Sequence, residues 1–419
     1  MNLLSPEPFW PIRGGLPQTY PSLAGNASCE VAVLGAGISG ALAAWHLAEA
    51  GVDVVVLDRR EVAHGSTAGS TSLLQYEIDE PLHRLARRYG PVQAAYAYRR
   101  SLAAVTGLGK LVRRLRIDCE FVDRTSLLLA SNDAHVPRLR REYEARARAG
   151  FDVEWWDRRR IIRGSTLPQP AAILSHGAGQ LDAYRLTYGL LAAARRRGAR
   201  IYDRTTVTGT RFHPRRVELR TAEGHCLRAR HLVVATGYEV DAFLKIRMTE
   251  LHSTFALISE PVAAFPGWPA ARCLIWETAD PYVYLRTTED GRVLIGGYDE
   301  PFRDPVARDR LLGPKTARLQ RRFRELLPRI PLQVAYAWAG TFAKTADGLP
   351  FIGRHPGVPH TWFALGYGGN GITYSFIAAE LIRDQILGVA RAEDDIFGFA
   401  RSPGSPPGRL ARRLKNVRF

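Results

Sequence analysis

Residues 30–40 read Glu-Val-Ala-Val-Leu-Gly-Ala-Gly-Ile-Ser-Gly, and the chain continues through a helix-forming stretch into a second apolar run that ends at Asp58. A β-prone run, a Gly-x-Gly-x-x-Gly turn, a helix and a second strand, in that order, are typical of a βαβ unit that binds a dinucleotide. Each glycine has a task. Gly35 permits the tight turn, Gly37 lets the backbone approach a pyrophosphate, and Gly40 lets the helix pack closely on the strand.

The same unit supplies groups for the other parts of a dinucleotide. The helix begins at Ile38 and Ser39, where free N–H groups and a partial positive charge favour phosphate. Asp58 lies about 20 residues after the first glycine, where a carboxylate meets a ribose hydroxyl, and Arg59 follows it. The alternative is an ordinary βαβ unit with a glycine-rich turn; the order of all the parts favours nucleotide binding.

Length and composition restrict the class of protein. A chain of 419 residues exceeds the size at which one hydrophobic core stops growing, so we expect two domains. No run approaches the ~20 apolar residues of a transmembrane segment, and Pro6, Pro8 and Pro11 interrupt any signal-like region at the N-terminus. The four cysteines are far apart and form no CxxC pair, which indicates reduced thiols, no metal site and a cytoplasmic protein.

The formal net charge of +17 would suit nucleic acid or an anionic membrane surface. Nearly all of the excess is arginine, dispersed in pairs and triplets at helical spacing, which is typical of solvated helix faces. We therefore expect no nucleic-acid partner. The basic segment 409–419 carries apolar residues at helical spacing, and we expect it to dock on its own protein or to fray rather than to touch a membrane.

The order of motifs along the chain predicts a discontinuous nucleotide domain. Residues 1–28 form a proline-rich leader that we expect to lie across the surface. Nucleotide signals then recur near the N-terminus, at 231–237 and near the C-terminus. We assign the nucleotide-binding domain to 1–85, 160–240 and 335–419, and a substrate domain to 86–159 and 241–334.

Periodicity and turn residues predict the main elements between these signals. We expect helices at 81–114, 136–149, 183–198, 314–327 and 372–387, strands at 119–122, 126–130, 334–340 and 362–365, a meander over 200–229 and a hairpin over 282–297.

A second glycine loop lies near the C-terminus. Residues 347–353 read Asp-Gly-Leu-Pro-Phe-Ile-Gly, and residues 366–372 read Gly-Tyr-Gly-Gly-Asn-Gly-Ile before a helix. A glycine-rich turn into a helix N-terminus presents N–H groups to a second negative charge.

With these motifs the chain resembles the D-amino-acid oxidase-type flavoprotein superfamily, which includes glycine, sarcosine and γ-glutamylputrescine oxidases. Four stretches carry the resemblance, and they span almost the whole chain: 30–58, the small-residue loop 64–72, Val207 with 232–237, and the C-terminal glycine loops. Family members usually have an Arg and a Gly in the middle of the loop 64–72, where this chain has Gly69 followed by Ser70, Thr71 and Ser72.

The resemblance implies an α/β fold in which a Rossmann-like FAD-binding domain carries an inserted antiparallel-sheet substrate domain. It also implies that FAD contacts the matching residues, with the C-terminal loop stabilising negative charge at flavin N1. These residues are Gly35, Gly37, Ile38, Ser39, Gly40, Asp58, Arg59, Ser66, Thr67, Ser72, Val207, Thr236, Gly237, Gly368, Gly369, Asn370, Gly371 and Ile372.

The substrate pocket is expected on the hairpin strand 282–286, where Tyr282, Tyr284 and Arg286 share one face. A half-exposed strand would show the same alternation. Family members that oxidise free amino acids have an Arg near the position of Trp338, whereas the run 337–341 more closely resembles the γ-glutamylputrescine oxidase branch. Our candidate catalytic residues are therefore Tyr284, Arg286 and Trp338.

Two further departures concern the cofactor. Members with tethered flavin have a cysteine near the position of Gly340, and this chain has none there, so we expect non-covalent FAD. The lysine that activates oxygen in the sarcosine branch aligns near Ile295 and is missing, so the electron acceptor is either O2 or another molecule.

The resemblance implies an FAD-dependent oxidoreductase that oxidises the C–N bond of a small amine or amino acid to an imine, by hydride transfer to flavin N5. Two alternatives stay open. One is a flavin domain acting on a modified nucleoside of RNA, which the positive charge would suit. The other is a non-catalytic FAD-binding scaffold.

Overall fold

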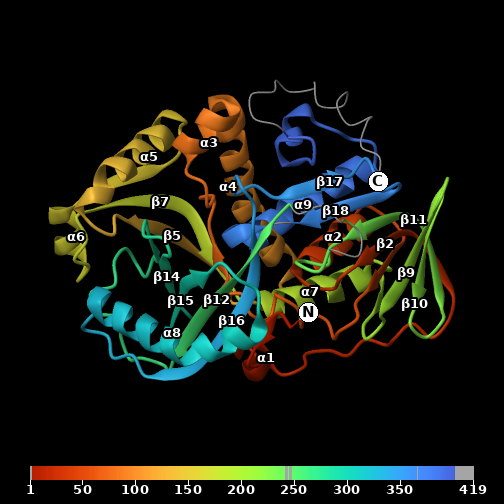
Figure 1. Ribbon diagram of the computed structural model, residues 1–419, viewed down its shortest axis with the longest axis horizontal. Coiled ribbons are helices and arrows are strands. Elements are labelled where there is room, and N and C mark those ends of the chain that lie inside the picture. The colour runs from red at the N-terminus through yellow and green to blue at the C-terminus, as the bar shows by residue number, and fades with distance from the viewer. Residues whose placement is uncertain (1, 241–243, 245–247, 366, 402–419) are drawn as a thin grey trace.

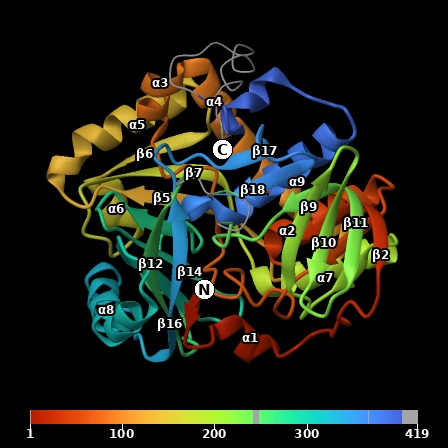
Figure 2. The ribbon, with the colours of Figure 1, turned by 45° about the vertical axis from the view of Figure 1, so that its right-hand side comes forward.

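The computed structural model describes residues 2–240, 244, 248–365 and 367–401, and within them the strands form an eight-stranded and a ten-stranded sheet (Figure 1). The two sheets lie on opposite sides of the molecule, and the chain crosses between them several times (Figures 1 and 2). The α/β fold with a parallel and an antiparallel sheet that the resemblance implies is confirmed.

The eight-stranded sheet has a parallel centre. Its order is β17 (Phe351–Arg354), β18 (Thr361–Leu365), β11 (Cys226–Val234), β2 (Ala27–Leu34), β3 (Val54–Leu57) and β8 (Arg200–Tyr202), and the hairpin of β9 (Val207–His213) and β10 (Arg216–Thr221) adds to β11.

Both faces of this sheet are covered, which is why its central strands are continuous apolar runs. Val31 and Val33 of β2 pack toward the helices, while Ala32 and Leu34 pack with residues of β10 and β18 on the other face. On the helical face, α2 (Ile38–Glu49) packs against α7 (Ala183–Arg196) and α9 (Gly371–Ile386), as Figure 2 shows.

The ten-stranded sheet is antiparallel except where β13 meets β5. Its order is β1 (Leu4–Ser5), β16 (Val334–Lys344), β12 (Glu250–Ser259), β15 (Val293–Glu300), β14 (Val283–Thr287), β13 (Leu274–Glu277), β5 (Val122–Leu129), β7 (Ala171–Gln180) and β4 (Leu73–Leu74), with β6 (Val153–Asp157) paired to β7.

Helices cover this second sheet at both ends. The helix α8 (Pro305–Leu326) packs on β12, β15 and β16, and α5 (Val136–Arg148) and α6 (Arg158–Gly164) lie at the opposite end against β6 and β7 (Figure 1). The remaining helical segments are α1 (Phe9–Gly14), α3 (Leu82–Tyr89), α4 (Pro91–Leu115), η1 (Asp133–His135), η2 (Gly368–Asn370) and η3 (Ala392–Phe397).

Several predicted elements differ from the observed ones. The helix predicted over 81–114 is two helices, because Gly90 adopts φ of +85° between them. The two short strands predicted at 119–130 are the single strand β5, and β8 pairs in parallel with β3 instead of joining a meander. The helix predicted from 314 begins at Pro305, where the Asp304 side chain caps it.

The predicted domain boundaries do not follow the sheets. Both β7 and β16 belong to the ten-stranded sheet, although the sequence assigned 160–240 and 335–419 to the nucleotide domain. The strand β7 was missed because its Ala, Ser and Gly residues carry little β signal.

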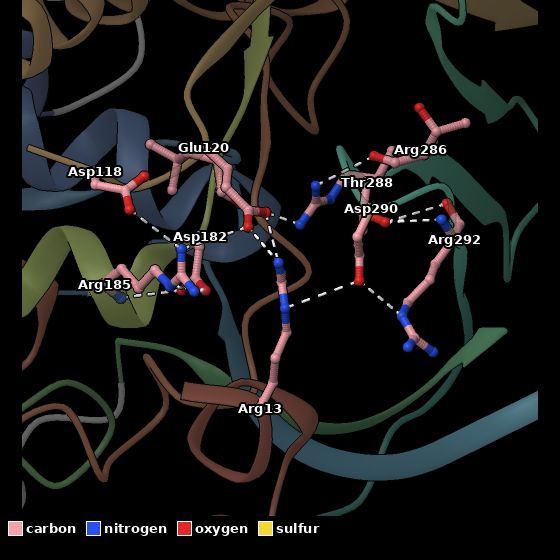
Figure 3. A network of polar contacts seen from close by, with 11 residues as sticks. Arg13, Asp118, Glu120, Asp182, Arg185, Arg286, Thr288, Asp290 and Arg292 are labelled. Atoms are coloured by element: carbon pink, nitrogen blue, oxygen red, sulfur yellow. Dashed lines mark hydrogen bonds and ion pairs between the residues drawn. The ribbon is translucent and has the colours of Figure 1, made fainter. Parts of the chain in front are cut away.

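The prediction that the proline-rich leader lies across the surface holds only in part, because Ile12 and Leu16 are exposed while other residues are buried. Trp10 of α1 is fully buried, Tyr20 is nearly so, and β1 pairs with β16. Figure 3 shows how ion pairs hold α1: Arg13 donates to both carboxylate oxygens of Glu120 and lies 3.9 Å from Asp290 in the β14–β15 turn. The segment is therefore anchored in the core by its aromatic residues.

No helix within the described ranges is long and apolar enough to cross a membrane. The basic segment 409–419 lies outside the described residues.

Candidate active site

A cavity of about 380 Å³ lies between the two sheets. One side consists of the carboxyl ends of the parallel strands β2, β3 and β11 and the turn before α9. The other side consists of residues of β12, β14 and β16 in the ten-stranded sheet. Open α/β sheets bind ligands at the carboxyl ends of their strands, so the cavity is the expected ligand site of this fold.

The first glycine loop is shaped as its spacing predicts. Gly35 has φ of +108°, and a Cβ there would lie 2.4 Å from the carbonyl oxygen of Ala235. At Gly40 a Cβ would lie 1.8 Å from the carbonyl oxygen of Gly35, so strand and helix approach as closely as backbone allows. A Cβ at Gly37 would meet only the Thr67 hydroxyl, at 3.0 Å, and Gly37 itself lines the cavity.

The N-terminus of α2 suits a phosphate group. It has no side-chain cap and no acidic residue in its first turn, and Ile38 and Ser39 line the cavity. The Ile38 N–H donates to the Thr67 hydroxyl at 3.0 Å. Two other hydroxyls of the cavity wall, those of Ser66 and Thr236, are buried without a hydrogen-bond partner among the described residues. Such groups are expected where a polar ligand completes the site.

Asp58 stabilises the glycine turn of the first βαβ unit through its carboxylate. One carboxylate oxygen accepts the Ala36 N–H at 2.6 Å and the other the Arg60 N–H at 2.8 Å. Burial raises the pKa of Asp58, and these hydrogen bonds oppose the rise. Arg59 contacts the Glu239 carboxylate, and Val207 lines the same end of the cavity. Ribose binding by Asp58 stays a prediction.

The second glycine loop has partners that the sequence did not suggest. The Gly369 N–H donates to Asp79 at 2.9 Å, and the Asn370 side chain donates to the carbonyls of Gln75 and Glu77 at 3.2 and 2.7 Å. Asn370 therefore fastens the segment after β4 to the start of α9. The residues 368–372 all line the cavity, and their contact with a flavin stays a prediction.

Three side chains from three elements hold consecutive carbonyls of the small-residue loop. The Trp338 indole donates to Gly69 at 3.0 Å, the Trp10 indole to Ser70 at 2.7 Å, and the Arg286 guanidinium to Thr71 at 2.6 Å. The loop borders the cavity with Ser66, Thr67 and Ser72. These three hydrogen bonds hold the backbone of the loop in place.

The structure corrects our expectation for Arg286, which we predicted to face the substrate. Arg286 is buried behind the loop, donates also to the Leu181 carbonyl at 3.1 Å and stacks over the Trp10 ring, and it is not among the residues that line the cavity. Burial lowers its pKa to about 10. Arg286 is thus a residue that positions the loop, in the charged network of Figure 3.

The other substrate-side candidates do reach the cavity. Tyr284 and Trp338 line it together with Tyr282 and Trp276, whereas the sequence did not identify Leu4, Asp79 or Asp299 as part of the same wall. These last residues come from β1, the segment before α3 and β15, so no local pattern connects them. Within the described ranges, no group of three or more His, Cys, Asp or Glu side chains is placed to hold a metal ion.

Comparison with known proteins identifies the family. Residues 30–385 match the family model DAO, described as FAD dependent oxidoreductase. The chain belongs to this family. Its cofactor is FAD, and the glycine cradles and unpartnered hydroxyls of the cavity fit such a ligand.

Individual relatives cover nearly the whole chain. Gamma-glutamylputrescine oxidoreductase of Escherichia coli is 28% identical over 405 residues, which are 94% of this chain and 91% of the relative. Glycine oxidase of Bacillus licheniformis is 26% identical over 380 residues, 86% and 93% of the two chains. The crystal structure of glycine oxidase from Geobacillus kaustophilus superposes with a TM-score of 0.74 at 22% identity, covering 90% of this chain and all of that one.

Proposed function

We propose that this FAD-dependent enzyme oxidises the C–N bond of an amine or amino acid to an imine, with hydride transfer to flavin N5. The observation that carries the proposal is one continuous cavity, which joins the glycine cradles of one sheet to a wall of aromatic and carboxylate side chains on the other. A cofactor and a small substrate can meet there. The names of the relatives, which include an amine and an amino-acid oxidoreductase, support the same reaction class.

When bound, FAD supplies the hydride acceptor, so the protein needs little acid–base machinery of its own. The chain's residues orient the substrate and exclude water from it. Tyr284 and Trp338 offer aromatic faces at the cavity wall, and the Trp338 indole N–H is already engaged with Gly69. The substrate therefore meets the flat face of Trp338, where an arginine would have gripped a carboxylate.

We expect the FAD to be held without a covalent bond, since no residue of the described cavity wall is a cysteine or a histidine. The purified protein should be yellow and should release its flavin into the supernatant when it is precipitated with acid. Absorbance of the supernatant and pellet measures the distribution. Flavin that stays with the precipitated polypeptide would contradict this part of the proposal.

The substrate class is tested by mixing the holoenzyme anaerobically with amines and with D- and L-amino acids, and by following the loss of flavin colour. Extended amines and γ-glutamyl-type amines should reduce the flavin faster than glycine or D-alanine, because Trp338 replaces the carboxylate-binding arginine. If small D-amino acids are the best reductants, and if Trp338→Ala leaves their rate unchanged, the proposed role of Trp338 in selecting the substrate is wrong.

Reoxidation of the reduced enzyme by O2 or by an artificial dye then identifies the class of electron acceptor. Reoxidation by air within seconds would indicate an oxidase, and reoxidation by the dye alone a dehydrogenase.

A further inference from the structure

Two carboxylates that the reaction does not account for meet at the substrate end of the cavity. Asp79 comes from the segment before α3 and Asp299 from β15, and both line the cavity next to Tyr282. Asp79 lies beside Tyr282: a Cβ at Gly369 would lie 2.8 Å from an Asp79 oxygen and 3.4 Å from the Tyr282 hydroxyl. Asp299 is close enough to Asp79 that the negative charge of Asp79 adds to the rise that burial causes in the pKa of Asp299. Burial raises the pKa of Tyr282, and the negative charges of Asp79 and Asp299 raise it further.

The charges at this end of the cavity do not balance. Lys344 is the cation that the described residues place beside the two carboxylates: its ammonium lies 3.6 Å from Asp299 and also acts on Asp79. Its side chain is one-third exposed to solvent, which weakens its effect. Glu77, a further carboxylate of the wall, lies 3.6 Å from the buried Arg146, which it shares with Glu142. Two negative groups thus share one partly solvated positive group.

Asp299 also has an oxygen without a partner. Its side chain is only 7% exposed, and its Oδ1 accepts no hydrogen bond from the described residues, although Thr254 lies beside the carboxylate. A buried carboxylate oxygen without a donor is costly, and burial accordingly raises the pKa of Asp299 and of Asp79. A ligand that brings a positive charge and N–H donors would remove this cost.

Aromatic rings complete the environment of a cation. The rings of Tyr282 and Tyr284 have centroids 6.0 Å apart and are inclined by 53°, and Trp276 and Phe342 line the cavity with them. The faces of aromatic rings attract ammonium groups, and the attraction is stronger where water is excluded. Carboxylates and ring faces together are the chemistry that recognises an alkylammonium group.

We propose that Asp79, Asp299 and Tyr282 form a subsite for an ammonium group of the substrate. The substrate is then an aliphatic diamine or polyamine, or a derivative that keeps one positive amino group, and no carboxylate of the substrate lies at this end. The assignment to a substrate rests on the proposed amine oxidation, whereas the affinity of the subsite for a cation does not. The subsite and the reaction can therefore be tested separately.

The test is calorimetric titration of the holoenzyme, reduced beforehand with dithionite under nitrogen so that no turnover occurs. The probes are 1,4-diaminobutane and succinate, which have similar lengths and opposite charges. The diamine should bind at least tenfold more tightly than succinate. Equal binding, or tighter binding of succinate, would overturn the proposal without any variant.

Variants locate the binding. Asp79→Asn and Asp299→Asn should each weaken the diamine at least tenfold, and Asn at position 79 retains an oxygen for the Gly369 N–H. The control Asp123→Asn removes a charge on the exposed surface, where Asp123 pairs with Arg113, and should leave the affinity unchanged. Flavin content and melting temperature confirm that each variant is folded.

The outcomes separate the subsite from the reaction. Unchanged affinity in folded Asp79→Asn and Asp299→Asn would overturn the subsite. If the diamine binds as expected but no amine bleaches the oxidised flavin, the proposed reaction fails and the cation subsite stands. If amines bleach the flavin and the diamine does not bind to the reduced enzyme in preference to succinate, the reverse holds.

Discussion

At the scale of the residue, substitutions at Gly37 and Gly40 should have different effects: the first on cofactor binding, the second on stability. A side chain at Gly40 would collide with the Gly35 carbonyl, whereas one at Gly37 would meet only a hydroxyl and would otherwise point into the cavity. Gly37→Val should therefore give a folded protein that lacks FAD. Gly40→Ala should lower stability by about 1–3 kcal/mol, the usual cost of overpacking.

Thermal melts of the apoproteins and the flavin content of the purified variants measure the two effects. A fully flavinylated Gly37→Val protein would refute the assignment of this loop to the pyrophosphate. A Gly40→Ala protein as stable as the wild type would show that strand and helix can separate without cost.

The same scale shows what the sequence could and could not predict. The glycines and Asp58 were predictable because their geometry is local to one βαβ unit. Alternation placed Tyr284 correctly on the cavity wall, but it failed for Arg286, because that end of β14 passes behind the loop 69–71. Asp299 was missed because its partner Asp79 is 220 positions away and no periodicity joins them.

At the scale of the element, the loop 69–71 is held in shape by Trp338, which lines the cavity, and by Trp10 and Arg286, which do not. Arg286→Met would leave the carbonyls of Thr71 and Leu181 without donors, which costs about 1–3 kcal/mol for each buried group. We expect lower stability and a weaker affinity for FAD, measured by fluorescence quenching during titration of the apoprotein. Arg211→Met, at an exposed position on β9, is the control. A loss of stability and FAD affinity of the same size in this control would contradict the role of Arg286 in holding the loop.

Helix α5 caps helix α3 through a buried carboxylate. Glu142 accepts the N–H groups of Leu82 and His83 at 3.0 and 3.1 Å and pairs with Arg146 at 2.6 Å. Burial opposes ionisation of Glu142, but the Arg146 charge and the His83 contacts prevail and hold its pKa at about 2. The unfolded chain has a glutamate pKa of about 4.3, so this contribution to stability is present above pH ~4.3 and is lost as the pH falls toward 2.

We therefore predict that Glu142→Gln lowers the free energy of unfolding at pH 7 by about 3–5 kcal/mol, because it leaves Arg146 buried with less compensation. Urea unfolding of both proteins at pH 7 and near pH 3 checks this. The difference between variant and wild type should shrink at the lower pH. A difference that is constant between the two pH values would show that the charge of Glu142 is not responsible.

At the scale of the whole molecule, the sequence predicted the interleaving of two sheets but not their boundaries. The glycine loops at both ends of the chain required a discontinuous nucleotide domain, and the parallel sheet has strands from both ends. The N-terminal segment was misjudged because prolines interrupt every periodic pattern around Trp10, so that its burial has no local signature. Leu4 of this segment nevertheless reaches the cavity wall.

The central claim is that an amine gives up hydride from its α-carbon to FAD in this cavity. The most direct measurement mixes the holoenzyme anaerobically with the fastest amine of the screen, in unlabelled form and with deuterium on the carbon that bears the amino group, and follows the bleaching of the flavin. The account predicts rapid bleaching that deuterium slows several-fold. No bleaching with any amine or amino acid, or equal rates at saturation with the two isotopes, would contradict it.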